Sequence, residues 1–310
     1  LSEAPWIKSV CLREKTQKLF QTQNEIFLST SSSTGLMEAA VRNSVDKKCL
    51  NLVNGHFGER WRVITETCGK ESVSLEAEWG QAIKPNEVRK KLESENFDAI
   101  TLVHSETSTG VFNPIKEISE VMKDFPEVSF LVDAVSSMAA TDVNVDALGI
   151  DVCLTGSQKA IAVSPGISMC SVSEKTMEKS SKLKNKGVYF DFKVFKEAAD
   201  KNLTPETPAL PQFFAFDFQL DRILKEGLQN RFQRHTDMAK VTREWAKENF
   251  ALFPEQGFEA TSLTVIENTK KIDFQKFSKS LKEKGFVIAP GFAKLADKTF
   301  RIGHMGDLTV

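Results

Sequence analysis

Residues 130–172 read FLVDAVSSMAATDVNVDALGIDVCLTGSQKAIAVSPGISMCSV, and this stretch decides the fold. It contains three apolar runs of strand length: Phe130–Val132, Val152–Leu154 and Ile167–Val172. The first run ends at Asp133, and the second leads into TGSQKA, which contains Lys159. Buried runs that end in polar residues are typical of α/β sheets, which bind ligands at the carboxyl ends of their strands. The stretch therefore predicts a binding site that contains Asp133 and Lys159.

A lysine and a carboxylate at neighbouring strand ends suit an aromatic aldehyde that has a nitrogen in its ring. The lysine amine forms a Schiff base with the aldehyde, and the carboxylate keeps the ring nitrogen protonated, so that the ring withdraws electrons. Pyridoxal phosphate is such a compound. Two ordinary strand ends, each followed by a polar residue, would give the same pattern, because Asp and Lys are individually common there.

Four motifs together resemble the class V aminotransferases, which belong to the fold-type I pyridoxal-phosphate enzymes. They are LVHSETSTGV at 102–111, VDAVSS at 132–137, DVCLTGSQKA at 151–160 and FRIGHMGD at 300–307. The resemblance extends from about Phe20 to Asp307 and is greatest to the alanine–glyoxylate and serine–pyruvate or serine–glyoxylate branch. It implies an α/β fold with a mostly parallel central sheet, flanking helices and a smaller C-terminal α+β domain. It also implies pyridoxal 5'-phosphate as the cofactor.

Apolar runs alternate with amphipathic segments from residue 26 to residue 172, which predicts a parallel sheet with crossover helices. The predicted strands are Ile26–Ser29, Cys49–Val53, Ser72–Leu75, Ala99–Val103, Ser129–Val132, Val152–Leu154 and Ile167–Val172. The predicted helices between them are Gly35–Ser44, Glu59–Cys68, Pro85–Glu93 and Pro114–Lys123.

The pattern divides the chain into three parts. Residues 1–210 are expected to form a large cofactor-binding domain, 211–250 a long linking helix, and 251–310 a small α+β domain. The small domain is predicted to contain strand, helix, strand and strand at Ala260–Ile266, Asp273–Lys284, Phe286–Ala289 and Thr299–Ile302. Family members usually have an N-terminal arm and a closing C-terminal helix beyond these ends, so we expect a truncated chain.

The segment STSSSTG, at residues 29–35, lies between a predicted strand and a predicted helix. Small residues let the backbone approach an anion, and successive N–H groups at a helix N-terminus suit a phosphate. A helix N-cap rich in Ser and Thr would have the same composition. In the family the corresponding loop holds the cofactor phosphate, so the resemblance assigns this role to Ser32, Ser33 and Thr34.

Two further loops follow predicted strands. NGHFGER, at residues 54–60, places Phe57 where the family has an aromatic residue that stacks on the cofactor ring, and His56 is expected to be a bystander. HSETSTG, the next such loop, offers hydroxyl groups that can bind the cofactor or cap a turn. By resemblance either Thr107 or Ser108 contacts the cofactor, and Ser108 is preferred.

The resemblance gives Asp133 and Lys159 catalytic roles. Asp133 is expected to face the ring nitrogen and to stay ionised because the ring carries a positive charge. Lys159 is expected to anchor the cofactor covalently and then to act as general base and acid at the substrate Cα, with a pKa that burial and nearby cations depress. Gln158 is assigned to the cofactor site, and Ser157 and Thr155 are further candidates for its phosphate or ring oxygen.

Two residues elsewhere in the chain complete the expected site. Arg301 has the planar guanidinium group that binds a carboxylate through two hydrogen bonds, and the family uses this position for the substrate carboxylate. TPETP, at residues 204–208, matches a segment that in relatives reaches the cofactor phosphate of the neighbouring subunit. Thr207 is the preferred residue there and Thr204 the alternative. The resemblance thus implies a homodimer with shared active sites.

The composition disfavours several classes of partner. A formal net charge of −1, from 41 basic and 42 acidic residues, creates no field that attracts nucleic acid or an anionic membrane. No apolar run is long enough to cross a bilayer. The five cysteines form no CxxC pair, and Cys153 and Cys170 lie in predicted strands, which indicates a reducing, cytoplasmic environment. A peroxisomal location stays open because a targeting tail could follow the present end.

The predicted function is transfer of an amino group from alanine or serine to glyoxylate or pyruvate in a ping-pong cycle, without a metal ion. A lyase or cysteine desulfurase on the same fold is one alternative, although the motifs offer no cysteine on a loop. A non-catalytic subunit of a larger complex is another, and the presence of Lys159, Asp133 and Arg301 disfavours it. A dinucleotide-dependent dehydrogenase is disfavoured because no GxGxxG follows a strand.

Overall fold

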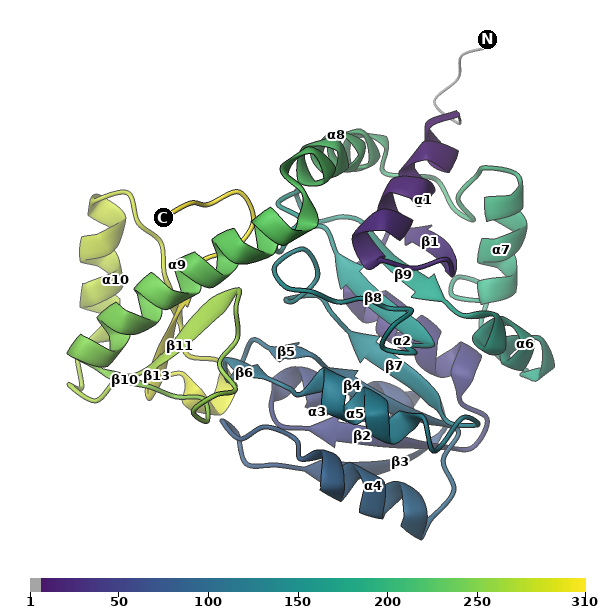
Figure 1. The fold of residues 1–310 in the computed structure, drawn as a ribbon, viewed down its shortest axis with the longest axis horizontal. Helices are drawn as coiled ribbons and strands as arrows, with labels where there is room; N and C mark the ends of the chain where they lie inside the picture. Colours follow the sequence, from purple (N-terminus) through teal and green to yellow (C-terminus); the bar gives the residue numbers. More distant parts are fainter. Residues whose placement is uncertain (1–6) are drawn as a thin grey trace.

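A seven-stranded sheet covered by helices on both faces forms the larger part of the fold (Figure 1). It is seen in a computed structural model, which describes residues 7–310, with side chains from Leu12 onward. A four-stranded sheet lies beside it and is formed by the C-terminal part of the chain. Among the residues described, no helix combines the length and the apolar character needed to cross a bilayer.

The large sheet is mostly parallel, as the sequence predicts. Its strand order is β1-β9-β8-β7-β4-β2-β3; β9 is antiparallel to β1 and β8, and the other neighbouring pairs are parallel. The strands are β1 (Glu25–Ser29), β2 (Lys48–Val53), β3 (Glu71–Glu76), β4 (Ala99–Val103), β7 (Ser129–Asp133), β8 (Val152–Gly156) and β9 (Ser168–Val172). Strands β4, β7, β8 and β9 are buried along their whole length, which explains why their sequences are largely apolar rather than alternating.

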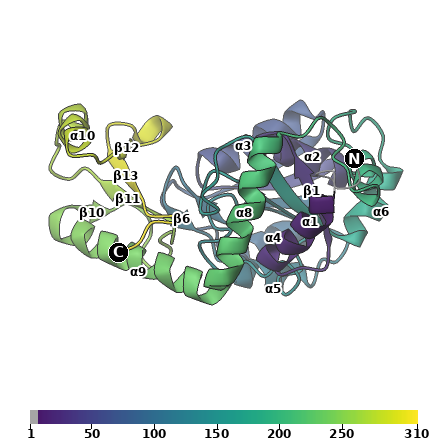
Figure 2. The same cartoon turned by 90° about the horizontal axis from the view of Figure 1, so that it is seen from above.

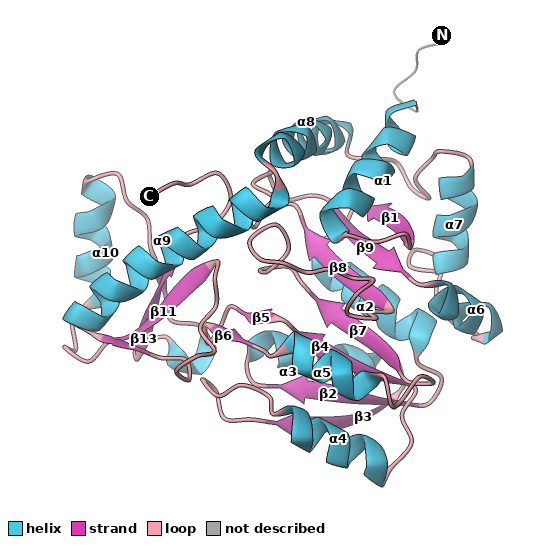
Figure 3. Cartoon of the chain, viewed as in Figure 1, coloured by secondary structure: helices cyan, strands magenta, loops and turns pink. Residues whose placement is uncertain are grey.

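Two hydrophobic cores cover the two faces of this sheet. One contains residues of α1 (Ile7–Phe20), α4 (Pro85–Ser94), α5 (Ile115–Met122) and α8 (Leu210–Glu226). The other contains residues of α2 (Ser33–Ser44), α3 (His56–Thr67), α6 (Glu174–Lys182) and α7 (Phe192–Asp200). In Figure 3, α1 and α5 lie in front of the sheet and α2 lies behind it. The sequence pattern does not predict α1 and α7.

Two helices, rather than the single linking helix predicted for residues 211–250, lead away from the large sheet. α8 ends at Glu226, and α9 (Leu228–Asn249) begins after Gly227. Gly227 has a φ of 83°, a left-handed value that glycine adopts without steric cost and that ends a right-handed helix. The break directs α9 along the small sheet (Figure 2).

The small sheet is antiparallel, in the order β10-β11-β13-β12. Its elements are β10 (Ala251–Leu252), β11 (Leu263–Glu267), α10 (Phe274–Glu283), β12 (Ala289–Pro290), the 3-10 helix η1 (Ala293–Leu295) and β13 (Thr299–Gly303). These elements follow the predicted order of strand, helix, strand and strand, with β10 and η1 in addition.

A hairpin of β5 (Ser105–Glu106) and β6 (Val111–Phe112) follows β4 and contacts the segment before β11. Its turn contains Gly110, which accepts a hydrogen bond from the N–H of Ala260 at 2.8 Å. Gly110 has a φ of 76°, and a Cβ there would lie 2.7 Å from the side chain of Val265 on β11. β13 pairs with β11, and its residue Arg301 donates to the carbonyl oxygen of Thr107 in the turn of this hairpin, near the predicted site.

Candidate active site

A cavity of about 290 Å³ lies at the carboxyl ends of β4, β7 and β8 and at the N-termini of α2 and α3. This is the sheet edge at which the sequence predicts a ligand. The predicted residues that line it are Ser32, Ser33, Thr34, Phe57, Asp133, Gln158 and Lys159. The structure therefore brings residues from separate sequence motifs to one space.

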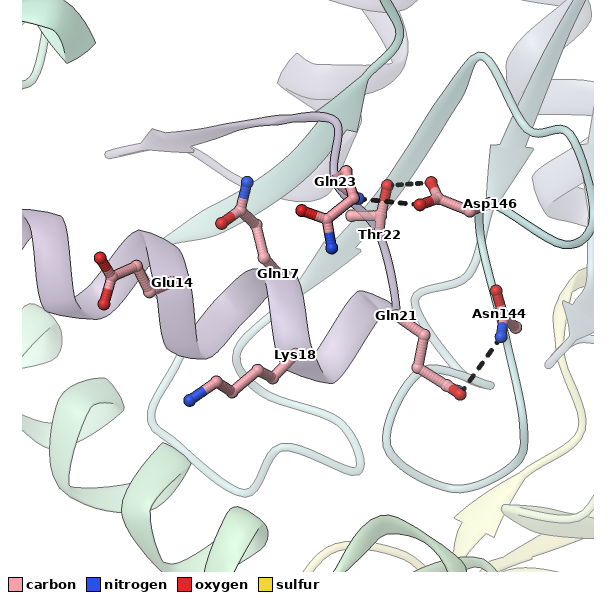
Figure 4. Close-up of a pocket in the computed structure, with 8 residues that line it drawn as sticks. All are labelled: Glu14, Gln17, Lys18, Gln21, Thr22, Gln23, Asn144 and Asp146. Atoms are coloured by element: carbon pink, nitrogen blue, oxygen red, sulfur yellow. Dashed lines mark hydrogen bonds between the residues drawn. The ribbon is translucent and has the colours of Figure 1, made fainter.

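A second hollow, of about 510 Å³, lies between the end of α1 and the loop before β8 (Figure 4). It is lined by polar residues: Glu14, Gln17, Lys18, Gln21, Thr22, Gln23, Asn144 and Asp146. Its polar groups bind one another, since Asp146 accepts hydrogen bonds from the Thr22 hydroxyl and from the N–H of Gln23, the latter at 2.9 Å. The residues predicted from sequence lie elsewhere, and we assign this hollow no function.

The N-terminus of α2 forms one end of the cavity. Ser32 is its N-cap residue but makes no side-chain cap, and Ser33 Oγ is buried without a hydrogen-bond partner among the described residues. Gly156, at the end of β8, lies so close that a Cβ there would be 2.5 Å from Ser33 Oγ. A helix N-terminus with unused donors beside a glycine can hold an anion. The predicted phosphate group fits this end of the cavity.

Asp133 lies at the end of β7 with its side chain buried. Its Oδ1 accepts a hydrogen bond from the N–H of Val135 at 2.8 Å. Burial raises the pKa of Asp133 to about 7, and Glu106 also raises it, against the hydrogen bond from Val135 and the charges of Arg60 and Lys159. A protonated ring nitrogen would supply the positive partner that a buried carboxylate needs, so the predicted pyridine ring fits here.

Lys159 follows β8 and lies half-buried in the wall of the cavity. Burial lowers the pKa of its amine, and the positive charge of Arg301 lowers it further, against the opposite charge of Asp133. Both causes agree with the sequence-based expectation of burial and a nearby cation. A lowered pKa makes the neutral amine available, and this is the form that attacks an aldehyde or accepts a proton.

The other candidates in the TGSQKA motif divide into two groups. Gln158 lines the cavity. Ser157 and Thr155 lie outside the cavity lining. The Ser157 hydroxyl donates to the carbonyl oxygen of Ser164 at 2.8 Å, and the Thr155 hydroxyl donates to that of Ala134 at 3.4 Å. These two residues shape the turn that carries Lys159.

Phe57 lies in the first turn of α3 and contributes an aromatic ring to the cavity wall. Its ring centre lies 5.3 Å from that of His56 and 5.9 Å from that of Phe292, and the Arg60 guanidinium lies 4.8 Å from it. Arg60 also lines the cavity and donates to Thr34 Oγ1 at 3.0 Å. An aromatic face in this position can stack on a flat ring ligand.

Thr107, rather than the preferred Ser108, lines the cavity. The Ser108 hydroxyl donates to Glu106 Oε1 at 2.6 Å and accepts a hydrogen bond from the N–H of His56 at 2.9 Å. Ser108 is thus occupied within the protein, and the geometry favours Thr107 as the residue of this pair that can meet a ligand.

Arg301, on β13, lies at the edge of the cavity and outside its lining. Its guanidinium donates to the carbonyl oxygens of Pro290 at 2.9 Å and Thr107 at 3.3 Å, and it lies 5.1 Å from the Phe292 ring centre. Burial lowers the pKa of Arg301, and no acidic neighbour in the described part of the chain offsets this effect. A half-buried guanidinium with no carboxylate beside it suits an anionic ligand.

Thr207 is exposed and lies outside the cavity of its own chain. The hydroxyl of Thr204, the alternative residue, donates to the carbonyl oxygen of Glu206 at 2.6 Å. The N–H of Ala209 binds Thr30 Oγ1 at 3.2 Å, which holds the end of this segment near the loop after β1. The role of Thr207 across a dimer interface stays a prediction.

Sequence reasoning did not identify Glu106 and Arg60. Glu106 is completely buried and accepts hydrogen bonds from backbone N–H groups of α3. Arg60 is a cation in the cavity wall. The signals that could have found them are the single acid within HSETSTG and the arginine one helical turn after Phe57.

The chain is similar to known aminotransferases over most of its length. The sequence profile described as Aminotransferase class-V matches residues 10–293. An uncharacterized aminotransferase of Methanocaldococcus jannaschii is 41% identical, with 94% of this chain and 78% of that protein covered. The serine–glyoxylate aminotransferase of Methylorubrum extorquens is 30% identical, with 96% and 78% covered. Among solved structures, an alanine–glyoxylate aminotransferase from Nostoc sp. has a TM-score of 0.92 at 26% identity, over 97% of this chain and 82% of that one.

Proposed function

Since this chain belongs to the class V aminotransferase family, we propose that it transfers the amino group of a small amino acid, alanine or serine, to glyoxylate or pyruvate. The main support is the cavity that joins Lys159, Asp133 and the α2 N-terminus, with Arg301 at its edge. In a ping-pong cycle the donor leaves as a keto acid before the acceptor enters, so that one cavity serves both. The similarity to a serine–glyoxylate aminotransferase and to an alanine–glyoxylate aminotransferase supports these substrates.

The family implies pyridoxal phosphate as the cofactor, and the residues of the cavity fit it. When bound, this cofactor supplies an aldehyde carbon that carries the amino group and a ring that withdraws electrons. The α2 N-terminus, residues 32–34, would hold the phosphate, and Asp133 would accept the hydrogen bond of the ring nitrogen. Phe57 would cover one face of the ring, and Thr107 and Gln158 would meet its polar edge.

Two residues would act on the substrate. Arg301 would bind the substrate carboxylate through two parallel hydrogen bonds, which orients the Cα–H bond. Lys159 would take the proton from Cα as a general base and return it to the neighbouring carbon as a general acid. The lowered pKa of Lys159 supports this role, because an amine that is neutral in the cavity can accept a proton there.

The surroundings of the cysteines disfavour a desulfurase, which needs a nucleophilic cysteine on a mobile loop. Among the cysteines whose side chains are described, Cys49, Cys153 and Cys170 are buried, and burial raises the pKa of each thiol. Cys68 lies at the end of α3 opposite to Phe57. A non-catalytic subunit is disfavoured because Lys159 and Asp133 line the cavity and Arg301 lies at its edge, and these are the groups that the proposed reaction would use.

A donor with a second carboxylate is the competing candidate, and Arg60 is the observation that favours it. Its terminal nitrogens contact Thr34 Oγ1 at 3.0 Å and His56 Nε2 at 3.1 Å. Burial and the charge of Arg60 lower the pKa of His56, so that both contacts are neutral near pH 7. A guanidinium that binds neutral groups inside a cavity suits the side-chain carboxylate of aspartate.

A homodimer is the proposed assembly. Helix α8 presents Leu210, Phe214 and Phe218 at intervals of four residues, hence on one face, and they are 41%, 45% and 67% exposed. Thr207 lies just before this face in the sequence. A second copy that covers α8 would also lie close to the segment that contains Thr207, and the shared-site prediction requires such an arrangement. Light scattering coupled to size-exclusion chromatography tests this, and a fully active monomer would contradict it.

The absorption spectrum of the protein loaded with pyridoxal phosphate tests the proposed reaction. It is recorded before and after addition of L-alanine, L-serine or L-aspartate, and again after glyoxylate or pyruvate. We expect the visible band to fall with the donor and to return with the acceptor, and the donor rates decide between the two substrate candidates. Lys159→Ala is the control that should bind cofactor without this conversion. A protein that binds no cofactor, or whose band no donor changes, would refute the proposal.

A further inference from the structure

The first turn of α3 is held by two side chains from the β5–β6 hairpin region. α3 begins at His56, and its first N–H groups have no acceptor within the helix. Ser108 Oγ accepts the N–H of His56 at 2.9 Å. Glu106 Oε2 accepts the N–H groups of Phe57 and Gly58 at 2.9 and 3.1 Å. The helix that carries Phe57 is therefore capped by a different segment of the chain.

This cap depends on the close approach of the hairpin to residue 55. A Cβ on Gly55 would lie 2.4 Å from Glu106 Cγ and 2.6 Å from Ser108 Oγ, so that only glycine leaves room. Glu106 and Ser108 are both completely buried. The contact is thus an interior one, in which hydrogen bonds to a charged group are strong and unpaired groups are costly.

Both carboxyl oxygens of Glu106 take part in hydrogen bonds. Its Oε1 accepts from the N–H of Ser108 at 3.0 Å and from the Ser108 hydroxyl at 2.6 Å. Its Oε2 accepts from the two N–H groups of α3. A carboxylate can accept all four bonds; burial raises the pKa of Glu106, and the hydrogen bonds from Ser108, Gly58 and Phe57 act in the opposite direction. The positive end of α3 stabilises the negative charge further.

Glu106 lies behind two residues of the cavity wall. Phe57, whose N–H it binds, presents its ring to the cavity. Asp133 is close enough for the charge of Glu106 to raise its pKa, while Arg60 and Lys159 act in the opposite direction. Glu106 itself lies outside the cavity lining. It can therefore influence a bound ring only through its neighbours.

We propose that Glu106 is a positioning residue for the cofactor. Its buried carboxylate holds Phe57 against the ring and keeps a negative charge behind Asp133, which favours a protonated ring nitrogen. The inference rests on the proposed function for the identity of the ring that enters the cavity.

Glu106→Gln is the variant that tests this role, because glutamine keeps the size but has one acceptor oxygen and turns an NH₂ group toward N–H donors. Asp151→Asn is the matched control. Asp151 is also buried and accepts the N–H of Phe130 at 2.9 Å and the Ser173 hydroxyl at 2.8 Å, but it precedes β8, at the end of the strand opposite to Gly156. Ser108→Ala is a milder second variant, since it weakens the cap and keeps the charge.

Three quantities are measured for each purified protein: the Tm, the Kd for pyridoxal phosphate after the cofactor has been removed, and the pH midpoint between the absorption bands of the bound cofactor. Glu106→Gln should raise the Kd by about tenfold or more. It should also lower the pH midpoint, because loss of a negative charge disfavours protonated groups nearby. Ser108→Ala should raise the Kd and leave the midpoint unchanged. Asp151→Asn should lower the Tm alone.

A double variant separates action through Phe57 from a general loss of structure. If Glu106 acts through the ring of Phe57, its effect on the Kd should be smaller in a Phe57→Leu background than in the wild type. Unchanged Kd and midpoint in Glu106→Gln would overturn the inference, and so would equal changes in Asp151→Asn. A wild-type protein that binds no pyridoxal phosphate would overturn the proposed function and this inference with it.

Discussion

Replacement of Asp133 by Asn should stabilise the cofactor-free protein at alkaline pH, although it removes the carboxylate that we propose binds the cofactor ring nitrogen. The pKa of Asp133 is about 7 in the folded protein, against 3.8 for an ordinary aspartate. Between these values the folded state keeps a proton that the unfolded chain has released. The corresponding stability is complete below about pH 3.8 and is lost as the pH rises through about 7.

The size of this effect follows from the interval of pH that is compared. From pH 5 to pH 8 the loss accumulates over about two pH units, up to the folded-state pKa, and amounts to ~3 kcal/mol at roughly 1.4 kcal/mol per unit. Asparagine keeps an oxygen that can accept the Val135 N–H, now at 2.8 Å from Asp133 Oδ1, and it cannot ionise. The Asp133→Asn protein should therefore not lose this part of its free energy of unfolding between pH 5 and pH 8.

Urea unfolding of both cofactor-free proteins at pH 5 and pH 8 measures the prediction. The free energy of unfolding of Asp133→Asn, relative to wild type, should rise by about 3 kcal/mol between the two pH values. If this relative free energy of unfolding rises by less than about 0.5 kcal/mol, burial does not raise the pKa of Asp133 as proposed, and the reasoning is refuted. Asp151→Asn is the control, because Asp151 pairs with Lys175 at 2.7 Å and its loss should destabilise the protein at pH 8.

Three other substitutions test the cavity. Lys159→Ala should abolish turnover and the adduct that borohydride reduction fixes, as seen by mass spectrometry; an active variant would end the proposed role of Lys159. Arg301→Ala should lower kcat/KM for amino-acid donors by about tenfold or more, ~1.4 kcal/mol, in steady-state assays, and unchanged kinetics would exclude Arg301 from substrate binding. Gly156→Ala would place a Cβ 2.5 Å from Ser33 Oγ and should weaken pyridoxal phosphate binding in a titration, whereas equal affinity would contradict the phosphate cradle.

The main residues of the cavity could be predicted from the sequence because of how parallel strands are arranged. Such strands end at one edge of the sheet, so the polar residues that follow them must meet there. Asp133 is the last residue of β7, Lys159 follows β8, and Ser33 follows β1, which runs parallel to β8. Their convergence needs only the pattern of apolar runs and the topology that the pattern predicts.

The choice between adjacent residues of the HSETSTG loop required the structure. Ser105 and Thr107 line the cavity, whereas Glu106 and Ser108 accept hydrogen bonds from N–H groups at the start of α3. The geometry therefore favours Thr107 over Ser108, and which of the two contacts the cofactor stays a prediction. Which side faces the cavity depends on the packing of α3, and no local signal in the sequence determines it.

The helix break at Gly227 was missed for a different reason. The apolar pattern continues across residues 211–250, and a single glycine inside a helical pattern is often tolerated. Here the left-handed φ of Gly227 is compatible with the turn between α8 and α9. The direction of α9 depends on tertiary contacts with β10 and β11 of the small sheet, which the apolar pattern of the helix does not reveal.

The position of β9 between β1 and β8 has a consequence for how the protein is made. β1 lies at the edge of the large sheet and pairs, within the described part of the chain, with β9. The loop that holds Ser33 follows β1, so it cannot be placed beside Gly156 until residues 168–172 have been synthesised and have entered the sheet. Pairings between segments so far apart in the sequence form slowly. During translation, nascent chains stalled before Ser168 should therefore not retain pyridoxal phosphate, and chains released after Val172 has left the ribosome are the first that could.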